Sequence, residues 1–514
     1  MKEAFEAVLT PEQMRFWEQT AFDSGVNPLL LMEDAARKVY AHLLPLLKEK
    51  GCSRVLVLCG AGNNGGDGAA LARLLLTDGY ATLLVGMKEP ATDSAKTMRA
   101  YYEALGGEAV AWMPDDDAAV HESRIAGFRP DCVVDALFGT GYRGTPTAVY
   151  QHVIRLINAL HAKVVVSVDV PSGMNSADGS VAVVGDEAMC IRATHTVTLG
   201  AWKSGMLLTS APECVGDLRL SPIALPGNAP DSGMKLITPA AFSWMPERLA
   251  KVHKGNAGRV LLYMGSAGMA GAAAMAARAA LRAGAGLVTV ACPGEIIPVL
   301  QKLVPNAMCV PSETLHERIP AHDVLAAGCG LGTAPETLER LKKLLNEEKG
   351  IAILDADALN LLADAQFALP EHTVLTPHPG EAARLLHASL DEILSRPMDS
   401  VKALAKRYGA AVLLKGHTSL ISDGQQVIIQ RRGAPALAKG GSGDALAGIL
   451  AALCADQTVC SGYPAQERLL NRTALASLWL GLAGEEAQKL YGDRSALTGE
   501  VIDLLGAARQ HCAV

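Results

Sequence analysis

The stretch RVLVLCGAGNNGGDGAALARLLLT, residues 54–77, decides the fold of the first half of the chain. Its opening run of valine and leucine predicts a buried strand, and its alanine- and leucine-rich end predicts a helix. The glycine-rich residues 60–68 between them suit a backbone that turns sharply from strand to helix, with its amides aimed at a pyrophosphate. The pattern G-x-G-x-x-G is a weak signal when it stands alone, and it is met here by Gly60, Gly62 and Gly65.

The alternation of strand and helix continues on both sides of this stretch. Helical patterns near 11–22 and 28–49 precede it, and the runs YATLLVG, DCVVDALFG, KVVVSVDVPSG and HTVTLG follow it as strands. This order is typical of βαβ units in a parallel sheet with helices on both faces. We therefore predict an α/β protein whose first part is a Rossmann-like, doubly wound sheet.

The alternation lapses once and then resumes. The stretch SPIALPGNAPDSGMKLITP, at 221–239, is rich in proline, glycine and asparagine and predicts a linker. From Arg259 onward strands and helices alternate again, with a hairpin predicted at SDGQ because Asp-Gly separates two alternating strands. We predict a first domain at 1–220, a linker at 221–235 and a different α/β domain at 236–514.

The composition excludes several classes of function. Of the 514 residues, 50% are hydrophobic, 19% are charged and 4% are aromatic, and the net charge is -7. These values fit a packed globular protein, whereas a nucleic-acid partner would favour basic patches or aromatic platforms. The 11 cysteines include no C-x-x-C pair, so we expect reduced thiols and a cytoplasmic protein. With no signal-peptide pattern and no long apolar run, we expect no membrane partner.

Polar side chains set the first glycine loop apart from a simple dinucleotide-binding turn. Asn63, Asn64 and Asp67 offer hydrogen bonds to a polar ligand, although a capped helix with turn asparagines is the simpler alternative. Asp135 and Asp169 end predicted strands, and in an open α/β sheet the carboxyl ends of strands line the binding crevice. One such carboxylate could be a strand-end cap, but two beside two glycine loops indicate a site.

The same edge of the sheet carries the oxygen ligands that a cation needs. Asn64, Asp135 and Ser172 would suit a hard cation. Asp169 could then act as the acid or base that moves a proton.

The first part resembles the epimerase domain of the bifunctional NAD(P)H-hydrate repair family, through GNNGGDG, VVDALFGTG, VDVPSG and VTLGAWKSG. That domain interconverts the R and S epimers of hydrated NADH and NADPH (NADHX and NADPHX). The resemblance implies Asp169 as a catalytic residue and a potassium ion near Asn64, Asp135 and Ser172. The substrate-binding residues that it implies are Asn63, Asn64, Gly65, Gly66, Asp67, Gly139, Thr140, Gly141, Tyr142, Arg143, Gly144, Thr145 and Asp169.

The second domain contains a glycine run that opens a helix, GGSGDALAGI at 440–449. Amides at a helix N-terminus bind anions, and Asp444 beside them could take a proton from a hydroxyl that attacks a phosphate. A flexible loop before a capped helix is the alternative, although consecutive glycines cost conformational entropy. Lys415 follows a strand, but a lone lysine is more often a surface residue, and His378 between two prolines could serve packing.

This second set resembles the ribokinase-like fold and, more narrowly, the ADP- or ATP-dependent NAD(P)H-hydrate dehydratases over about 236–510. The matching stretches are HKGNAGRVLLYMGSAGMAGAA, TPHPGE, KGHTS and GGSGD. In that family the hydroxyl of the hydrate is phosphorylated and phosphate is then eliminated, which restores NAD(P)H. The resemblance implies Asp444 as the general base, ADP as co-substrate with ATP as a second option, and Mg²⁺ with the nucleotide.

The resemblance also assigns binding residues in this domain. It implies hydrate contacts from Ala272, Gly332, His378 and Asp444. The nucleotide contacts that it implies are Lys415, Gly416, His417, Thr418, Ser419, Gly441, Ser442 and Gly443.

Two other functions remain open from the residues alone. A vitamin-precursor kinase of the ribokinase superfamily, with an accessory nucleotide-binding domain, would share Asp444 but release a stable phosphorylated product. A non-enzymatic ligand-binding module would have no need of both Asp135 and Asp169. We favour the repair enzyme, with NADHX and NADPHX as small-molecule substrates, and its apolar helices lead us to expect a homo-oligomer.

Overall fold

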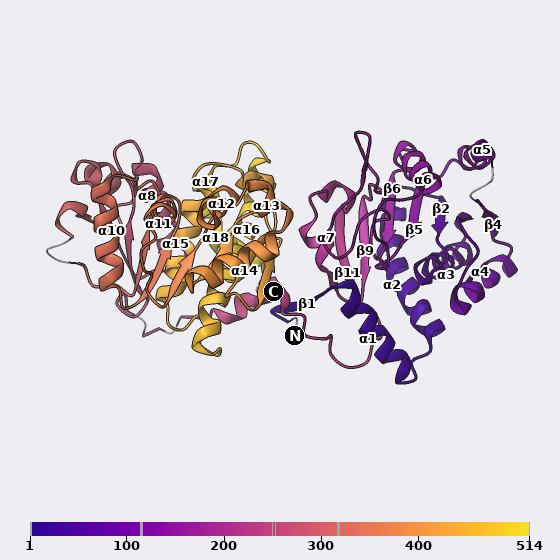
Figure 1. The fold of residues 1–514 in the computed structure, drawn as a ribbon, viewed down its shortest axis with the longest axis horizontal. Helices are drawn as coiled ribbons and strands as arrows, with labels where there is room; N and C mark the ends of the chain where they lie inside the picture. The colour runs from indigo at the N-terminus through magenta and orange to yellow at the C-terminus, as the bar shows by residue number, and fades with distance from the viewer. Residues whose placement is uncertain (1–2, 114–116, 249, 252, 316–318, 513–514) are drawn as a thin grey trace. The chain divides into compact units, whose positions relative to one another are not determined.

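The computed structural model describes residues 3–113, 117–248, 250–251, 253–315 and 319–512. The chain forms two compact units, each an α/β structure around its own sheet (Figure 1). The first unit is Ala7–Ser232, and the second combines Met1–Glu6 with Gly233–Val514. The predicted α/β fold class is therefore confirmed.

The limits of the two units differ slightly from the predicted domains. Residues 221–232, most of the predicted linker, pack on the first unit, where the Ala224 amide donates to Asp34 at 2.9 Å. Near the start of the chain, the Thr238 amide donates to the Ala4 carbonyl oxygen at 3.0 Å, so this segment belongs with the second unit. The functional extents 1–220 and 236–514 remain predictions.

The first unit is built on a parallel sheet with the strand order β11-β9-β6-β5-β2-β3-β4. These strands are β2 (Arg54–Cys59), β3 (Ala81–Gly86), β4 (Glu108–Ala111), β5 (Cys132–Ala136), β6 (Val164–Val168), β9 (His195–Leu199) and β11 (Asp217–Ser221). Short pairs lie outside it: β1 (Phe5–Leu9) with β10 (Trp202–Lys203), and β7 (Val183–Val184) with β8 (Glu187–Ala188). The helices are α1 (Pro11–Asp23), α2 (Pro28–Glu49), α3 (Asn63–Thr77), α4 (Asp93–Ala104), α5 (Ala118–Phe128), α6 (Ala148–Ala159) and α7 (Ser204–Leu208).

Alternate residues of each strand face opposite layers of helices. In β2, Val55 and Val57 belong to a core with α2, α3 and α4, whereas Leu56 and Leu58 pack with α5 and α6. All four side chains are fully buried, as expected for a parallel sheet covered on both faces. The predicted doubly wound sheet is therefore confirmed.

The start of α3 corrects one prediction. We expected a loop at residues 60–68, but the helix begins at Asn63, directly after Gly62. Helix propensity argues against three glycines in its first two turns, yet close packing requires them. A Cβ on Gly65 would lie 1.9 Å from the Gly60 carbonyl oxygen, and one on Gly68 would lie 2.6 Å from the Cβ of Ala136. The glycines therefore let the helix approach the sheet.

The second unit is built on a sheet with the strand order β12-β21-β20-β19-β18-β17-β16-β13-β14-β15. Neighbouring strands are parallel except where β20 pairs with β19 and with β21. The strands are β12 (Met234–Ile237), β13 (Arg259–Tyr263), β14 (Leu287–Cys292), β15 (Met308–Pro311), β16 (Val324–Ala327), β17 (Ile351–Leu354), β18 (Thr373–Leu375), β19 (Ala411–Leu414), β20 (Ser419–Ser422) and β21 (Val427–Gln430). The hairpin predicted at SDGQ joins β20 to β21 and is confirmed.

The helices of the second unit alternate with these strands and then close the chain. They are α8 (Ala270–Arg282), α9 (Ile297–Leu303), α10 (Pro335–Glu347), α11 (Asp357–Ala365), α12 (Pro379–Leu386), α13 (Leu390–Ser395), α14 (Pro397–Tyr408), α15 (Ser442–Ala455), α16 (Ala465–Tyr491), α17 (Thr498–Asp503) and α18 (Leu505–Cys512). Within the described ranges, no helix combines the length and the apolarity that a membrane span requires.

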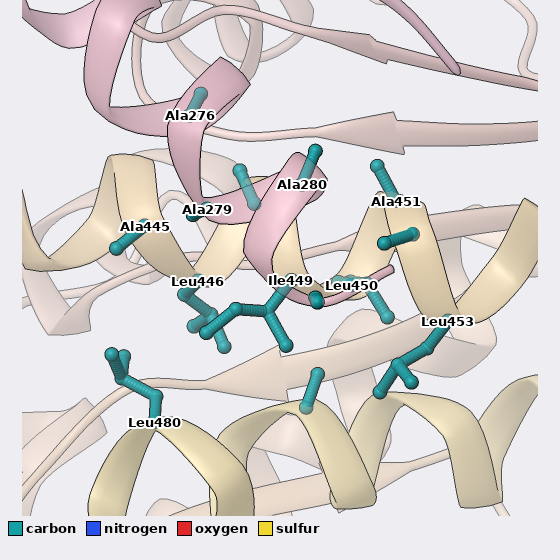
Figure 2. Packing of buried hydrophobic residues seen from close by; sticks show 14 of the residues in the cluster. Ala276, Ala279, Ala280, Ala445, Leu446, Ile449, Leu450, Ala451, Leu453 and Leu480 are labelled. Atoms are coloured by element: carbon teal, nitrogen blue, oxygen red, sulfur yellow. The ribbon is translucent and has the colours of Figure 1, made fainter. Parts of the chain in front are cut away.

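Close packing of α8 against α15 fixes the start of α15, where the predicted anion hole lies. Figure 2 shows small side chains of α8, among them Ala276 and Ala280, against α15, with α16 on its other side. The glycine of α15 at this contact, Gly448, has the Ala276 carbonyl oxygen 2.1 Å from where its Cβ would be. Small residues therefore let the two backbones approach, and the buried contact holds α15 in place.

Candidate functional site

The first candidate site lies at the switch point of the first sheet. From β2 the chain moves outward through β3 and β4 and then returns to β5 on the other side of β2. The loops after β2 and β5 therefore diverge, which leaves a crevice at the carboxyl ends of the strands. A cavity of about 520 Å³ lies there, and all of its lining residues belong to the first unit.

Many of the predicted ligand residues line this cavity. They are Asn63, Asn64, Asp67, Gly139, Thr140, Gly141, Tyr142 and Asp169. The remaining predicted residues are not among its lining: Gly65, Gly66, Arg143, Gly144 and Thr145. A Cβ on Gly66 would lie 2.5 Å from the terminal methyl of Met32, so this glycine serves the packing of α3. The cavity also has aromatic lining that the sequence did not suggest, from Phe22, Phe138 and Tyr150.

Asp169 has a strained backbone conformation, and its carboxylate pairs with a buried lysine. Its φ of 66° lies in the left-handed region that non-glycine residues rarely adopt, and such strain concentrates at functional sites. Lys203, whose side chain is 1% exposed, forms an ion pair with Oδ1 of Asp169. The Leu199 amide donates to the same oxygen at 3.1 Å. The carboxylate is thus fixed in direction, with its charge balanced inside the cavity wall.

Asp135, near the end of β5, forms hydrogen bonds to β6 and to the loop that follows β6. The carboxylate is fully buried and accepts from the Ser172 amide at 2.8 Å, the Ser172 hydroxyl at 2.5 Å and the Ser167 hydroxyl at 2.8 Å. Burial raises the pKa of Asp135, and these hydrogen bonds partly oppose the rise. Asp135 therefore has a structural role in addition to any role as a ligand.

Hydrogen bonds through the backbone of Phe138 connect the predicted cation ligands. Asn64 donates its side-chain amide to the Phe138 carbonyl oxygen at 2.9 Å, and the Phe138 amide donates to the Ser172 hydroxyl at 2.9 Å. Because Ser172 also contacts Asp135, all three predicted ligands belong to one connected group. Among the described residues, no group of three or more His, Cys, Asp or Glu could hold a metal ion. The donors are carboxylate, hydroxyl, amide and carbonyl oxygens, which fit a hard cation.

Two further carboxyl groups line the cavity, Glu18 from α1 and Asp67 from α3. Burial and, to a smaller extent, the charge of Asp169 raise the pKa of Glu18 to about 7, although Lys203 and Arg15 act in the opposite direction. Burial also raises the pKa of Asp67 well above its usual value, and Asp169 and Glu18 add to that rise. Glu18 was not predicted, because a single glutamate on an amphipathic helix gives no signal in the sequence.

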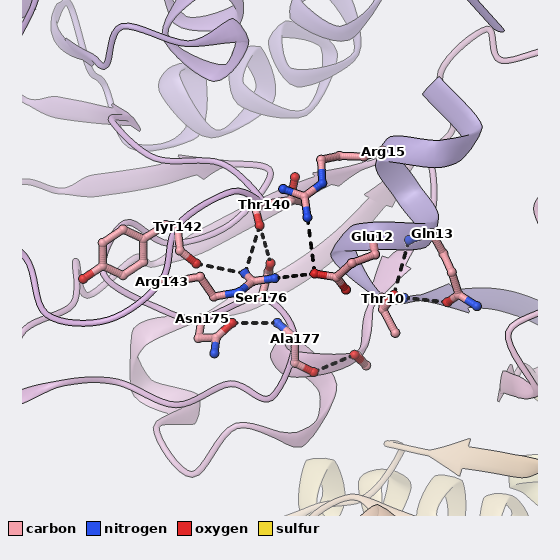
Figure 3. A network of polar contacts seen from close by, with 11 residues as sticks. Thr10, Glu12, Gln13, Arg15, Thr140, Tyr142, Arg143, Asn175, Ser176 and Ala177 are labelled. Carbon is pink, nitrogen blue, oxygen red and sulfur yellow. Dashed lines mark hydrogen bonds and ion pairs between the residues drawn. The ribbon is translucent and has the colours of Figure 1, made fainter. Parts of the chain in front are cut away.

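Arg143 connects the second glycine loop to α1 instead of lining the cavity. Figure 3 shows its guanidinium between the Thr140 and Tyr142 carbonyl oxygens, at 3.2 and 3.0 Å, and Glu12 at 2.8 Å. Glu12 also pairs with Arg15, which is a cavity residue. The Arg143 side chain thereby holds the loop at 139–145 close to the helix that carries Glu18.

The second candidate site lies at the start of α15. Gly441 is the N-cap with a φ of 98°, and Asp444 lies in the first turn, as predicted. A side chain at Gly441 would meet the Met275 sulfur at 2.2 Å, so only glycine fits this turn. Burial raises the pKa of Asp444; Cys329 and Lys415 oppose the rise, and the charge of Asp355 adds to it.

Lys415 is a partly buried member of a charged cluster, with 22% of its side chain exposed. Its ammonium group lies 2.7 Å from Asp355 Oδ1 and 3.9 Å from Glu381 Oε2. Burial alone would lower the pKa of Lys415, but the two carboxylates outweigh it and raise the pKa. A Cβ on Gly443 would lie 3.4 Å from Asp355 and 3.6 Å from Lys415, so both side chains lie beside the anion hole.

Asp355 is a residue of this site that was not predicted from the sequence. It follows β17 in the run LDADAL, directly before Ala356, whose φ is 49°. The available signal was an aspartate at the carboxyl end of a buried strand, the same signal that identified Asp135 and Asp169.

The other predicted residues lie on neighbouring loops of the second unit. His378 caps α12: its Nδ1 accepts from the Gly380 amide at 3.0 Å, and its own amide donates to Glu381 at 2.8 Å. Gly332 donates its amide to Asp357 at 2.8 Å, and Ala272 lies 3.1 Å from where a Cβ of Gly330 would be. Gly416 and His417 are exposed, and Thr418 and Ser419 are partly buried. The Ser442 hydroxyl donates to the Leu437 carbonyl oxygen at 2.8 Å.

Comparison with known proteins finds matches over both units. A family model described as YjeF-related protein N-terminus matches residues 29–205, and one described as NAD(P)H-hydrate dehydratase matches residues 260–505. The bifunctional NAD(P)H-hydrate repair enzyme Nnr of Moorella thermoacetica is 36% identical, over 97% of this chain and 96% of that protein. The enzyme of the same name from Escherichia coli is 36% identical, over 77% of this chain and 75% of that protein.

One similar solved structure covers the second part of the chain. It is an ADP/ATP-dependent NAD(P)H-hydrate dehydratase from Bacillus subtilis, co-crystallized with ATP/Mg²⁺. Its sequence is 26% identical to this one, the match covers 54% of this chain and 97% of that chain, and the TM-score is 0.47.

Proposed function

Because the chain belongs to the family of bifunctional NAD(P)H-hydrate repair enzymes, we propose that the cavity of its first unit is the epimerase site and the cluster at α15 is the dehydratase site. The protein is an isomerase and a lyase: it interconverts the R and S forms of NAD(P)HX and dehydrates the S form to NAD(P)H. The observation that carries the assignment of the first site is the Asp169–Lys203 pair in the wall of a cavity at a topological switch point.

The epimerase cavity suits a hydrated nicotinamide ring. Water added across a C=C bond of a dihydropyridine places the hydroxyl on a carbon bonded to the ring nitrogen. Phe138 and Tyr142 stack with centroids 4.6 Å apart and offer an apolar wall for the ring. Asp169, fixed by Lys203, is the group that accepts a proton when water adds to that carbon.

The dehydratase cluster suits transfer of a phosphoryl group to the hydroxyl of the hydrate. Asp444 takes the hydroxyl proton while the oxygen attacks the terminal phosphorus of ADP, and AMP leaves. The amides from Gly441 to Gly443 and the ammonium of Lys415 stabilise charge on the phosphoryl oxygens. Phosphate then leaves from carbon together with a proton from the neighbouring carbon, and the ring double bond is restored.

Three ionic components complete the proposal. ADP is the phosphoryl donor, with ATP as the second option, and Mg²⁺ enters with the nucleotide phosphates. The group around Asn64, Asp135 and Ser172 would hold potassium, which would supply a fixed positive charge beside the substrate. We also propose that the enzyme works in the cytoplasm and as a homo-oligomer.

The first test follows absorbance at the reduced-nicotinamide band after the protein and ADP are added to a mixture of NADHX epimers. Full recovery of NADH with release of one phosphate per NADH is expected. Recovery that stops near the share of one epimer would contradict the assignment of the first unit. A stable phosphorylated product without NADH would instead indicate a small-molecule kinase.

A further inference from the structure

Inversion of the hydroxyl-bearing carbon requires acid–base groups on both faces of the ring, and Asp169 alone does not supply both. The hydroxyl must leave from one face of the ring as water, which requires a proton donor on that face. Water must then add to the opposite face, which requires a proton acceptor there. One carboxyl group fixed in direction, as Asp169 is by Lys203 and the Leu199 amide, serves one face of a bound ring.

A second carboxyl group is available in the same cavity from a different element. Glu18 belongs to α1, whereas Asp169 follows β6, and both line the cavity. The two groups are close enough for the charge of Asp169 to shift the titration of Glu18. The other charged groups that line the cavity are Arg15, Asp67, Lys88 and Lys203.

We propose that Glu18 is the second acid–base group of the epimerase and works on the ring face opposite Asp169. This rests on the proposed epimerase function of the cavity. The Glu18 carboxyl gives its proton to the hydroxyl, the C–O bond breaks, and the ring nitrogen lone pair forms a C=N⁺ bond. Water adds to the other face, Asp169 takes its proton, and the lone pair returns to nitrogen. One proton has then moved from Glu18 to Asp169, no electrons are gained or lost, and exchange with solvent resets the pair.

The active form of such a pair carries one proton between the two carboxyl groups. The pKa of Glu18 is raised to about 7, so this proton is lost as the pH rises through about 7. We therefore expect kcat/KM to fall over that range, both for conversion of R to S and for conversion of S to R. A free glutamate, with a pKa near 4.5, would place the fall far lower.

The test measures conversion of the isolated epimers against pH, with the protein-free rate subtracted, in the full-length protein. We expect Glu18→Gln to lower kcat by roughly 10²–10⁴-fold with little change in KM, and to abolish the fall near neutral pH. Glu18→Asp should keep the fall at reduced rate. Glu49→Gln on the exposed end of α2 is the matched control and should behave like the wild type.

Three outcomes would overturn the assignment of Glu18. The first is a wild-type kcat/KM that does not fall near pH 7, and the second is a Glu18→Gln protein that keeps its kcat. The third is loss of the fall near pH 7 in Asp67→Asn but not in Glu18→Gln. Failure of the proposed function looks different, because the wild type would then not accelerate epimerisation at any pH. Dehydration of the pure S epimer, measured in every variant, shows that the second unit is intact.

Discussion

Asp444 lies in the first turn of α15 beside the backbone amides of the anion hole, so removal of its charge should impair the chemical step and leave nucleotide binding largely unchanged. We expect Asp444→Asn to bind ADP with near-normal affinity and to lose roughly 10²–10⁴-fold in dehydratase kcat, the usual contribution of a general base. Isothermal titration with ADP and the rate of NADH formation from the S epimer measure the two effects. Full activity in this variant would exclude Asp444 as the base.

The pH dependence of the wild type provides a second check on Asp444. The base works only when ionised, and burial raises the pKa of Asp444 above its ordinary value of 3.8. Dehydratase kcat should therefore fall as the pH is lowered through this raised pKa, at a higher pH than a free aspartate would give. A rate that stays constant down to the range of a free carboxyl group would contradict the assignment.

Removal of the Lys203 ammonium group should lower both the stability of the first unit and its epimerase activity. Lys203→Met leaves the carboxylate of Asp169 without its buried partner, which typically costs about 3–5 kcal/mol of stability. We expect loss of epimerase activity and a lower denaturant midpoint for the first unit, while the second unit unfolds as before. The double variant Asp169→Asn with Lys203→Met should regain much of the stability but none of the activity. Equal stability of Lys203→Met and the wild type would show that the pair contributes nothing to folding.

Among the site residues, the sequence predicted those that lie beside glycine-rich loops and missed those that do not, such as Glu18 and Asp355. Asp135, Asp169 and Asp444 were predicted because each lies at a strand end or a helix start beside glycines. Glu18 was missed because it reaches the cavity from the middle of a helix, and α1 is placed by tertiary packing that no local pattern encodes. The pairing of Lys415 with Asp355 depends on two strand ends about sixty residues apart in the chain, so the sequence predicted a nucleotide contact for Lys415 but not its carboxylate partner.

At the scale of elements, the start of α3 shows how glycines at a binding loop can serve packing. We expect Gly65→Ala to destabilise the first unit by about 1–3 kcal/mol or more, because its Cβ would lie 1.9 Å from the Gly60 carbonyl oxygen. Alanine in a helix would otherwise stabilise by roughly 0.5–1 kcal/mol. Denaturant unfolding of the full chain measures the change. The matched control is Gly62→Ala, where nothing lies within 4 Å of the added Cβ. Equal stability of the two variants would contradict the packing role.

The order of elements was easier to predict than their limits. Strands such as β2 and β16 consist almost entirely of apolar residues, and such runs are typical of buried parallel strands. The helix predicted from residue 69 begins at Asn63, because packing at Gly65 and Gly68 outweighed the low helix propensity of glycine. The predicted start of α15 was correct because Gly441 adopts a φ that favours glycine and Asp444 suits a first helical turn.

At the scale of the whole molecule, each proposed site is built inside a single unit. The cavity with Asp169 is lined by residues of Ala7–Ser232, and the cluster of Asp355, Lys415 and Asp444 belongs to Gly233–Val514. The residues assigned to each site therefore come from one unit alone. Joining them in one chain makes chemical sense, because a dehydratase that accepts one epimer would leave the other unrepaired.

This division predicts complementation between two inactive chains. Asp169→Ala should recover NADH only from the S epimer, apart from spontaneous epimerisation, and Asp444→Asn should equilibrate the epimers without forming NADH. An equimolar mixture of the two should recover the whole epimer mixture, since the free S epimer can diffuse from one chain to the other. Absorbance at the reduced-nicotinamide band with ADP present measures all three cases. In the control mixture, the double variant Asp169→Ala with Asp444→Asn takes the place of one of the two single variants. A mixture that stops at the share of the S epimer, although each variant keeps its own activity, would mean that the substrate must pass between the sites of one chain.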